Sequence, residues 1–209
     1  MNDKKRKERI RLLISRLNQE RKKQARQIDI LCNDLIAAQK EFIKGLNTVR
    51  FAADFYERIA GVTDLNELLY TAGKFINDQI LDVTVAFFLQ HPDNFELHIF
   101  ESDQPAGQED SRLENCFTTE IVNGISRSNK VCSLEDMFAF GLQGRPSYLE
   151  RFSAYAIPLA DRGLALGFIL VYRSNRNQLT NDELKCICGV TPGLSRAIAS
   201  CKTATHATK

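Results

Sequence analysis

The fold is decided by one stretch near the C-terminus, Ser153-Ala-Tyr-Ala-Ile-Pro-Leu-Ala-Asp-Arg-Gly-Leu-Ala-Leu-Gly-Phe-Ile-Leu-Val-Tyr172. Two apolar runs, residues 153–160 and 164–172, flank the turn-forming Asp161-Arg-Gly163, and this pattern predicts a β-hairpin. In the second run, apolar residues follow one another without alternating with polar ones. A strand of this kind has to be covered on both faces, so we expect helices or loops on either side of it.

A second hairpin is predicted upstream. Residues 83–89 are apolar and β-branched without alternation, whereas residues 95–100 alternate as a half-buried strand does. His91-Pro-Asp-Asn94 between them has the composition of a turn. We therefore expect two pairs of antiparallel strands in this chain.

The helices near these hairpins have recognisable starts. Asp64-Leu-Asn-Glu67 and Thr180-Asn-Asp-Glu183 are capping boxes, and the helix after the second is expected to be kinked or broken at Pro192-Gly193. A third helix is predicted from apolar residues at helical spacing: Leu113, Cys116, Phe117, Ile121 and Ile125. A polar stretch leads into it, and a short strand, a turn of helix and a loop follow it (102–111, 130–134, 135–140 and 141–147).

A long helix is predicted at the N-terminus, because residues 4–61 contain no proline. Apolar residues recur three and four positions apart, which is the heptad pattern of a parallel two-stranded coiled coil. The predicted dimerisation residues are Ile14, Leu17, Ile28, Leu31, Leu35 and Phe42. Arg21, Gln24 and Gly45 interrupt this seam, and polar seam residues lower stability while setting register or permitting a local change of packing.

Charge is distributed unevenly along the chain. Residues 1–26 carry eleven Lys/Arg against three acids, a net charge of +8, so the remainder carries −6 within an overall charge of +2. The charges of such a basic arm either keep a long helix hydrated or attract an acidic partner. Nucleic acid, bound through residues 4–26, is one such partner. The sequence has no transmembrane segment, no secretory signal and no paired cysteine motif among its six cysteines, which predicts a cytoplasmic protein with reduced thiols.

The order of these elements resembles the GAF family of sensory domains over residues 55–200. Its most specific part is Ala156-Ile-Pro-Leu159, a glycine turn, Leu166-Gly-Phe-Ile-Leu170 and the helix start at Leu179–Glu183. The resemblance implies an α+β fold in which an antiparallel sheet is sandwiched between helices; the PAS fold is the alternative. We thus predict a basic helix or coiled coil (1–54), a GAF-like domain (55–201) and a polar tail (202–209).

The resemblance also implies where a ligand would bind. Its pocket would lie between the central strands, the third helix and the loops around residues 102–147, with Phe88, Cys116, Phe117, Ser133, Tyr148 and Tyr155 as candidate ligand-binding residues. Each of them has ordinary core packing as its alternative role.

No particular ligand or cofactor is indicated by these residues. The Asn-Lys-x-x-x-Glu pattern of GAF domains that bind cyclic nucleotides is missing, and no cysteine has the neighbours that bilin attachment needs. For haem, only His91, His98 and His206 are available, and each is expected at the surface. No cluster of zinc ligands occurs, so no metal site is predicted and the cofactor is unknown.

The predicted function is that of a dimeric signalling module. A small ligand or a partner protein would shift the packing of the GAF-like domain, and the coiled coil would carry that change to a signalling partner protein. No catalytic residue is assigned, and we expect no enzyme. Two alternatives stay open: a ligand-regulated nucleic-acid-binding protein, and a GAF-fold reductase of free methionine sulfoxide that would use Cys116 and Cys132.

Overall fold

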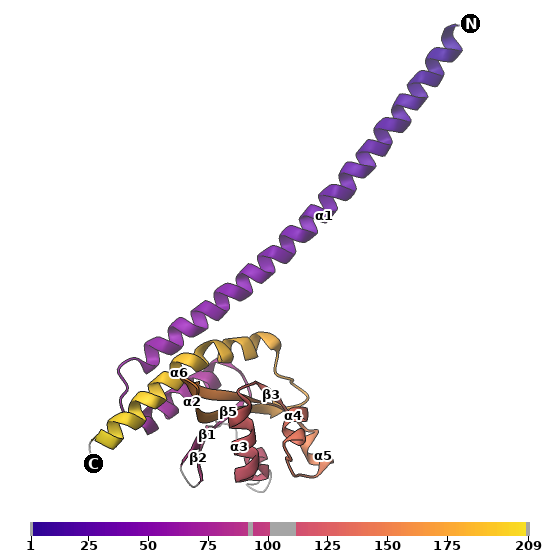
Figure 1. Cartoon of the computed structure of the whole chain (residues 1–209). Helices are drawn as coiled ribbons and strands as arrows, with labels where there is room; N and C mark the ends of the chain where they lie inside the picture. Colours follow the sequence, from indigo (N-terminus) through magenta and orange to yellow (C-terminus); the bar gives the residue numbers. More distant parts are fainter. Residues whose placement is uncertain (1, 92–93, 101–111, 208–209) are drawn as a thin grey trace. The chain divides into compact units, whose positions relative to one another are not determined.

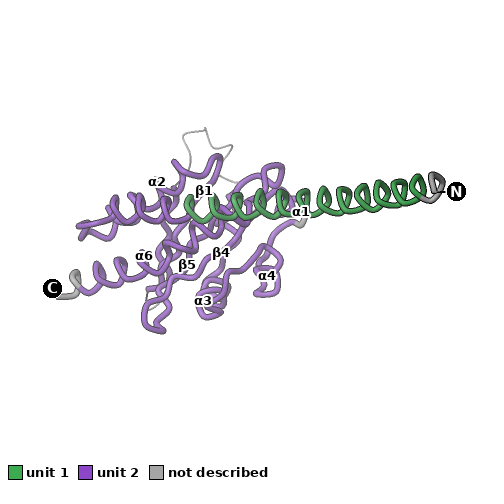
Figure 2. Tube along the Cα trace, turned by 90° about the horizontal axis from the view of Figure 1, so that it is seen from above, with its two compact units in different colours: residues 1–47 green, residues 48–209 purple. Residues whose placement is uncertain are grey.

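The computed structural model describes residues 2–91, 94–100 and 112–207, with the backbone alone for residues 2–5, 146 and 204–207. The chain divides into two compact units, residues 1–47 and 48–209 (Figures 1 and 2). Helix α1 (Asn2–Ile59) makes up the first unit and continues into the second. The predicted long N-terminal helix is therefore confirmed.

The second unit is built on one five-stranded antiparallel sheet in the order β2-β1-β5-β4-β3 (Figure 1). Its strands are β1 (Thr84–Gln90), β2 (Phe95–Phe100), β3 (Cys132–Ser133), β4 (Phe152–Asp161) and β5 (Leu164–Ser174). Both predicted hairpins are present. The turn between β4 and β5 has Arg162 and Gly163 at φ of 49° and 83°, which is the left-handed backbone of a tight two-residue hairpin loop.

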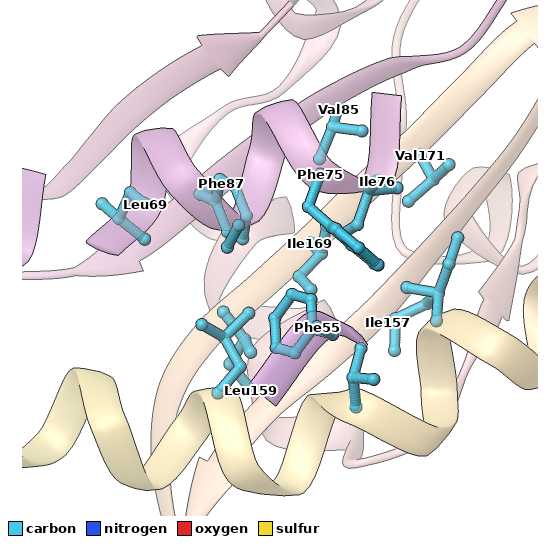
Figure 3. Close-up of a cluster of buried hydrophobic side chains, with 14 of the residues drawn as sticks. Phe55, Leu69, Phe75, Ile76, Val85, Phe87, Ile157, Leu159, Ile169 and Val171 are labelled. Carbon is cyan, nitrogen blue, oxygen red and sulfur yellow. The ribbon is translucent and has the colours of Figure 1, made fainter. Parts of the chain in front are cut away.

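One face of the sheet is covered by long helices. These are α2 (Leu65–Gln79), α6 (Asn181–Ala207) and the part of α1 from Thr48 to Ile59. Figure 3 shows Phe55 of α1 surrounded by side chains from α2 and from the sheet. Its ring meets the Phe75 ring edge-to-face with 5.4 Å between centroids, and both residues are buried. The end of α1 is thus part of the core of the second unit.

The opposite face is covered by short elements: η2 (Leu113–Cys116), α3 (Thr119–Ser128), α4 (Leu134–Ala139) and α5 (Pro146–Leu149). The prediction of a single third helix is wrong, because the chain is extended at Phe117 and Thr118 between η2 and α3. This break turns the Phe117 ring onto Phe88, 5.0 Å away. The polar stretch 102–111 lies outside the described residues.

Of the kink or break expected at Pro192-Gly193, a break does not occur, since α6 continues through both residues. Val190 and Leu194 on either side are fully buried, and this packing compensates for the hydrogen bond that a proline cannot donate. Gly193 has a separate role, because a Cβ atom there would lie 2.2 Å from the Tyr56 ring. Helix α6 extends to Ala207 and so includes most of the predicted tail; residues 208–209 lie outside the described part.

A buried arginine ties the end of β5 to the start of α6. Arg173 is only 5% exposed, donates to the carbonyl oxygens of Leu81 and Gln178, and donates to both carboxylate oxygens of Glu183 at 3.0 and 2.8 Å. Glu183 also completes the predicted capping box with Thr180. Burial raises the pKa of Glu183, but the hydrogen bonds from Thr180 and Arg173 outweigh it and hold that pKa below its ordinary value of 4.5.

This arrangement predicts a loss of stability in acid. Because the pKa of Glu183 is lower in the folded chain, its ionised form stabilises the fold above pH 4.5, and this contribution disappears as the pH falls through the lowered pKa. We expect the free energy of unfolding of Glu183→Gln to fall less steeply between pH 5 and about 3 than that of the wild type. Urea unfolding at each pH measures this, and equal slopes would contradict it.

A second prediction concerns the contact between β1 and β5. Gly167 has φ of 139°, and a Cβ atom there would lie 1.8 Å from the backbone oxygen of Phe88. Since backbone has to move to relieve this clash, Gly167→Ala should lower the free energy of unfolding by about 3 kcal/mol or more. Gly189→Ala in α6 is the control, because no atom lies within 4 Å and alanine favours helix. Chemical denaturation compares them.

Candidate functional site

The six candidate ligand-binding residues lie in three places. Phe88 and Phe117 belong to an aromatic cluster between the sheet and α3. The Phe88 ring stacks on Phe168 with centroids 4.7 Å apart and contacts Phe95 at 5.4 Å. Both candidates are buried, Phe88 fully and Phe117 to 7% exposure. Rings fill the space between the centre of the sheet and α3.

Cys116 and Tyr148 line an open pocket at the side of this cluster. It lies between η2 and the segment 144–151, and its volume is about 440 Å³, within the range of small-molecule sites. It is lined by the side chains of Arg112, Asn115, Cys116, Arg145, Tyr148 and Arg151, and Gly144 and Ser147 complete the lining. The predicted loop at 141–147 does therefore border a cavity. We call this cavity the arginine pocket.

Ser133 and Tyr155 line a different cavity at the β3–β4 edge of the sheet, with a volume of about 570 Å³. They are direct partners in the strand ladder. Ser133 is occupied with capping α4, because its hydroxyl bonds Asp136 at 2.8 Å and accepts from the Asp136 backbone N–H. The backbone N–H of Ser133 in turn lowers the pKa of Asp136. This cavity is thus bordered by a helix cap that the sequence reading missed, although Ser133-Leu-Glu-Asp136 is a recognisable capping pattern.

Sequence reasoning also missed a buried acid behind the arginine pocket. Glu114 of η2 is 3% exposed, and both its carboxylate oxygens lie 2.9 Å from the hydroxyl oxygen of Tyr172 on β5. Tyr172 is itself buried, and Phe152 meets its ring edge-to-face. An acid between Leu113 and Cys116 in an apolar helical pattern is the signal that could have found it. The contact fixes η2 to the central strand.

Glu114 also affects the groups that line the arginine pocket. Burial raises the pKa of the Cys116 thiol, and the Glu114 carboxylate raises it further. Burial likewise raises the pKa of Tyr148, assisted by Cys116 and Glu114 and opposed by the Arg151 guanidinium. At neutral pH both groups therefore stay protonated, and the Tyr148 hydroxyl is a hydrogen-bond donor.

The two cysteines named for a reductase lie in different surroundings. Cys132 is buried in β3, where its thiol donates to the carbonyl oxygen of Lys130 at 3.3 Å, and it does not line the arginine pocket. None of the six cysteines forms a disulfide, and of these only Cys32 is exposed. Within residues 2–91, 94–100 and 112–207, no group of three or more His, Cys, Asp or Glu could hold a metal ion. Among the described helices, none has the length and apolar character to cross a membrane.

Solved structures with the same fold include GAF domains and the enzyme fRMsr. The GAF domain of a phosphoenolpyruvate-protein phosphotransferase from Acinetobacter has a TM-score of 0.55 at 13% identity, covering 76% of this chain and 97% of that one. GAF3 of a Synechocystis protein, in its photoproduct state, has a TM-score of 0.53 at 14% identity, covering 70% and 100%. The fRMsr of Staphylococcus aureus, in complex with substrate, has a TM-score of 0.53 at 10% identity, covering 73% and 95%.

These likenesses show the fold. No family model and no curated protein sequence matches the chain. The expectation that the protein is not an enzyme has to be corrected, because fRMsr has this fold and was solved with its substrate. The fold serves sensors and an enzyme alike, so it excludes neither. The second unit has the GAF fold, as the order of strands and capped helices predicts.

A prediction follows for the buried acid. Tyr172→Phe removes the hydroxyl that faces the Glu114 carboxylate and keeps the ring, so the free energy of unfolding should fall by about 1–3 kcal/mol. Tyr70→Phe is the control, because Tyr70 is exposed and its ring contacts survive the change. Denaturant unfolding compares the two variants. An equal loss in both would show that the buried contact contributes nothing.

Proposed function

We propose that the chain is a dimeric regulatory module. Its GAF-fold domain responds to a small ligand or a partner protein, and α1 joins two copies as a parallel coiled coil. The photoproduct state of the Synechocystis GAF3 supports the first part, since it is a domain of this fold that changes state on a stimulus. Nucleic acid binding through residues 4–26 stays a prediction beside this proposal.

The observation that carries the proposal is an exposed apolar stripe on α1. Six residues at heptad spacing are each between 53% and 67% exposed: Ile14, Leu17, Ile28, Leu31, Leu35 and Phe42. Soluble single chains rarely expose apolar side chains in so long a row. A second copy of the same helix, in parallel and in register, would bury each residue against its own counterpart.

The continuity of α1 supports a route for the signal from the GAF-fold domain to the coiled coil. The helix is unbroken from Asn2 to Ile59, and its last turns place Phe51 and Phe55 in the core of the second unit. Phe51 meets Phe75 of α2 edge-to-face at 5.0 Å. A repacking of this core would therefore move the helix that carries the seam. Interior packing is dense enough to transmit such small shifts.

The interruptions of the seam supply an adjustable element. Arg21, Gln24 and Gly45 occupy positions where apolar residues would pack. A coiled coil with such gaps has more than one packing of similar free energy, and a ligand can bias that balance. The interrupted stretch is therefore our candidate for the two-state part of the module.

The proposal predicts a loss of dimerisation when charges enter the seam. Ile28→Lys with Leu35→Lys should convert a dimer at micromolar concentration into a monomer, because like charges would face each other across the axis. Sedimentation equilibrium of the full chain measures the mass.

The matched control is Ile30→Lys with Ile36→Lys. These two residues are 59% and 50% exposed, as apolar as the seam pair and two or one positions away from it, but they lie outside the heptad seam. The control should remain a dimer. A wild-type monomer would overturn the proposal, and dimer loss in both double variants would overturn the seam assignment.

A further inference from the structure

Helix α1 carries a second apolar stripe beside the proposed heptad seam, which we call the first seam. Between residues 31 and 46, the residues that directly follow those of the first seam are also mostly apolar: Cys32, Ile36, Gln39, Ile43 and Leu46. Their spacing of four, three, four and three is itself a heptad pattern, and we call this stripe the second seam. Ile36, Ile43 and Leu46 are 50%, 56% and 52% exposed. Cys32 is exposed as well, so the second seam is open to solvent in the single chain.

The two seams are closely matched over these turns. The first consists of Leu31, Leu35, Ala38, Phe42 and Gly45, which provide three large apolar side chains, one methyl group and one gap. The second provides three large apolar side chains, one thiol and one amide. A coiled coil is stabilised by the apolar side chains buried at its seam, so the two packings have similar free energies.

Each seam is weak where the other is strong. Gly45 leaves the first seam without a side chain, and the next residue, Leu46, fills the same level of the second. Conversely, Gln39 places an amide in the second seam, whereas Ala38 keeps the first apolar at that level. A polar residue in a seam lowers stability, and so does a missing side chain. Neither packing is therefore free of defects.

The match does not extend toward the N-terminus. Ile14, Leu17 and Ile28 of the first seam are followed by a serine, an asparagine and an aspartate. In the second packing, the aspartate would face its counterpart from the other copy, and two like charges repel each other. The N-terminal part of the coiled coil is thus restricted to the first seam, and only residues 31–46 have two choices.

We infer that residues 31–46 of α1 form a switch between two coiled-coil registers, with a second copy of this chain as the partner in both. Consecutive residues of an α-helix lie about 100° apart around its axis, so turning the segment by this angle exchanges the seams. One register places Leu35 and Phe42 at the dimer axis, and the other places Ile36 and Ile43 there. The inference rests on the proposed dimer and deepens it by naming the part that moves.

The continuity of α1 gives the GAF-fold domain a way to set this switch. The helix runs without a break from residues 31–46 to Phe51 and Phe55, which lie in the core of the second unit. A repacking of that core that turns the end of α1 favours one register over the other. A ligand with different affinities for the two core packings would therefore shift the population of registers.

Disulfide crosslinking of the full chain tests the two registers. A disulfide requires two Cα atoms within about 7 Å, a separation reached by facing seam residues and not by residues that point outward. The native Cys32 reports the second register. In a Cys32→Ser background, Ala38→Cys reports the first register, and Asn33→Cys is the control because position 33 lies outside both seams. The other five cysteines are common to the three chains, and mass spectrometry locates each disulfide.

Cys32 and Ala38→Cys should each crosslink at least about tenfold faster than Asn33→Cys in a glutathione buffer. Fast crosslinking through Ala38→Cys alone overturns the second register and leaves the proposed dimer intact. Fast crosslinking through Cys32 alone overturns the exchange, because the second seam would then be the sole one. If neither is faster than the control, the parallel coiled coil fails and the inference fails with it; sedimentation of the same chains then shows whether another dimer remains.

A matched pair of leucine substitutions tests the exchange itself. Gly45→Leu fills the gap in the first seam, and no atom of the single chain lies within 4 Å of a Cβ placed there. Gln39→Leu removes the amide from the second seam. Gly45→Leu should slow crosslinking through Cys32 and speed it through Ala38→Cys, each by at least about threefold, and Gln39→Leu should do the reverse. Equal changes in both variants, or none in either, overturn the exchange.

Discussion

Strand β5 is apolar on both of its faces, and most of the second unit is arranged to cover it. Phe168, Leu170 and Tyr172 point to the side of α3, while Ile169 and Val171 point to the side of α2 and α6. It lies at the centre of the sheet between β1 and β4. Such a strand loses its stability if either face meets water. Two separate layers of chain are therefore obligatory, one on each face.

The two layers meet this requirement differently. Long helices cover one face, and one of them, α1, continues beyond the second unit as an exposed helix. Short elements joined by loops cover the other face, and these leave a polar cavity at the side of the aromatic cluster. Long packed helices suit transmission, whereas loops on a rigid sheet suit recognition. The sheet between them is the common support of both.

Buried charged residues hold elements of both layers to strand β5. Arg173 fastens the start of α6 to the end of β5, and Glu114 fastens η2 to the same strand through Tyr172. Each contact is made by a charged group with little solvent exposure, so removing one partner takes away part of the compensation of a buried charge. The two fastenings lie on adjacent residues of β5, Tyr172 and Arg173, which point to opposite faces. The elements on the two faces of the sheet are thus held at neighbouring residues of a single strand.

Patterns local in sequence were enough to predict the strands, the two hairpins, the caps of α2 and α6 and the long N-terminal helix. Turn geometry, capping boxes and apolar periodicity depend on residues within a few positions of each other, so the chain specifies them by itself. Only the tertiary structure decided where the candidate residues lie. Cys116 and Tyr148 share a pocket, but Phe88 packs in the core and Ser133 caps a helix. The convergence of Arg112, Arg145 and Arg151 depends on η2 being fastened to β5, a contact between residues 58 positions apart, and no local pattern encodes such a distance.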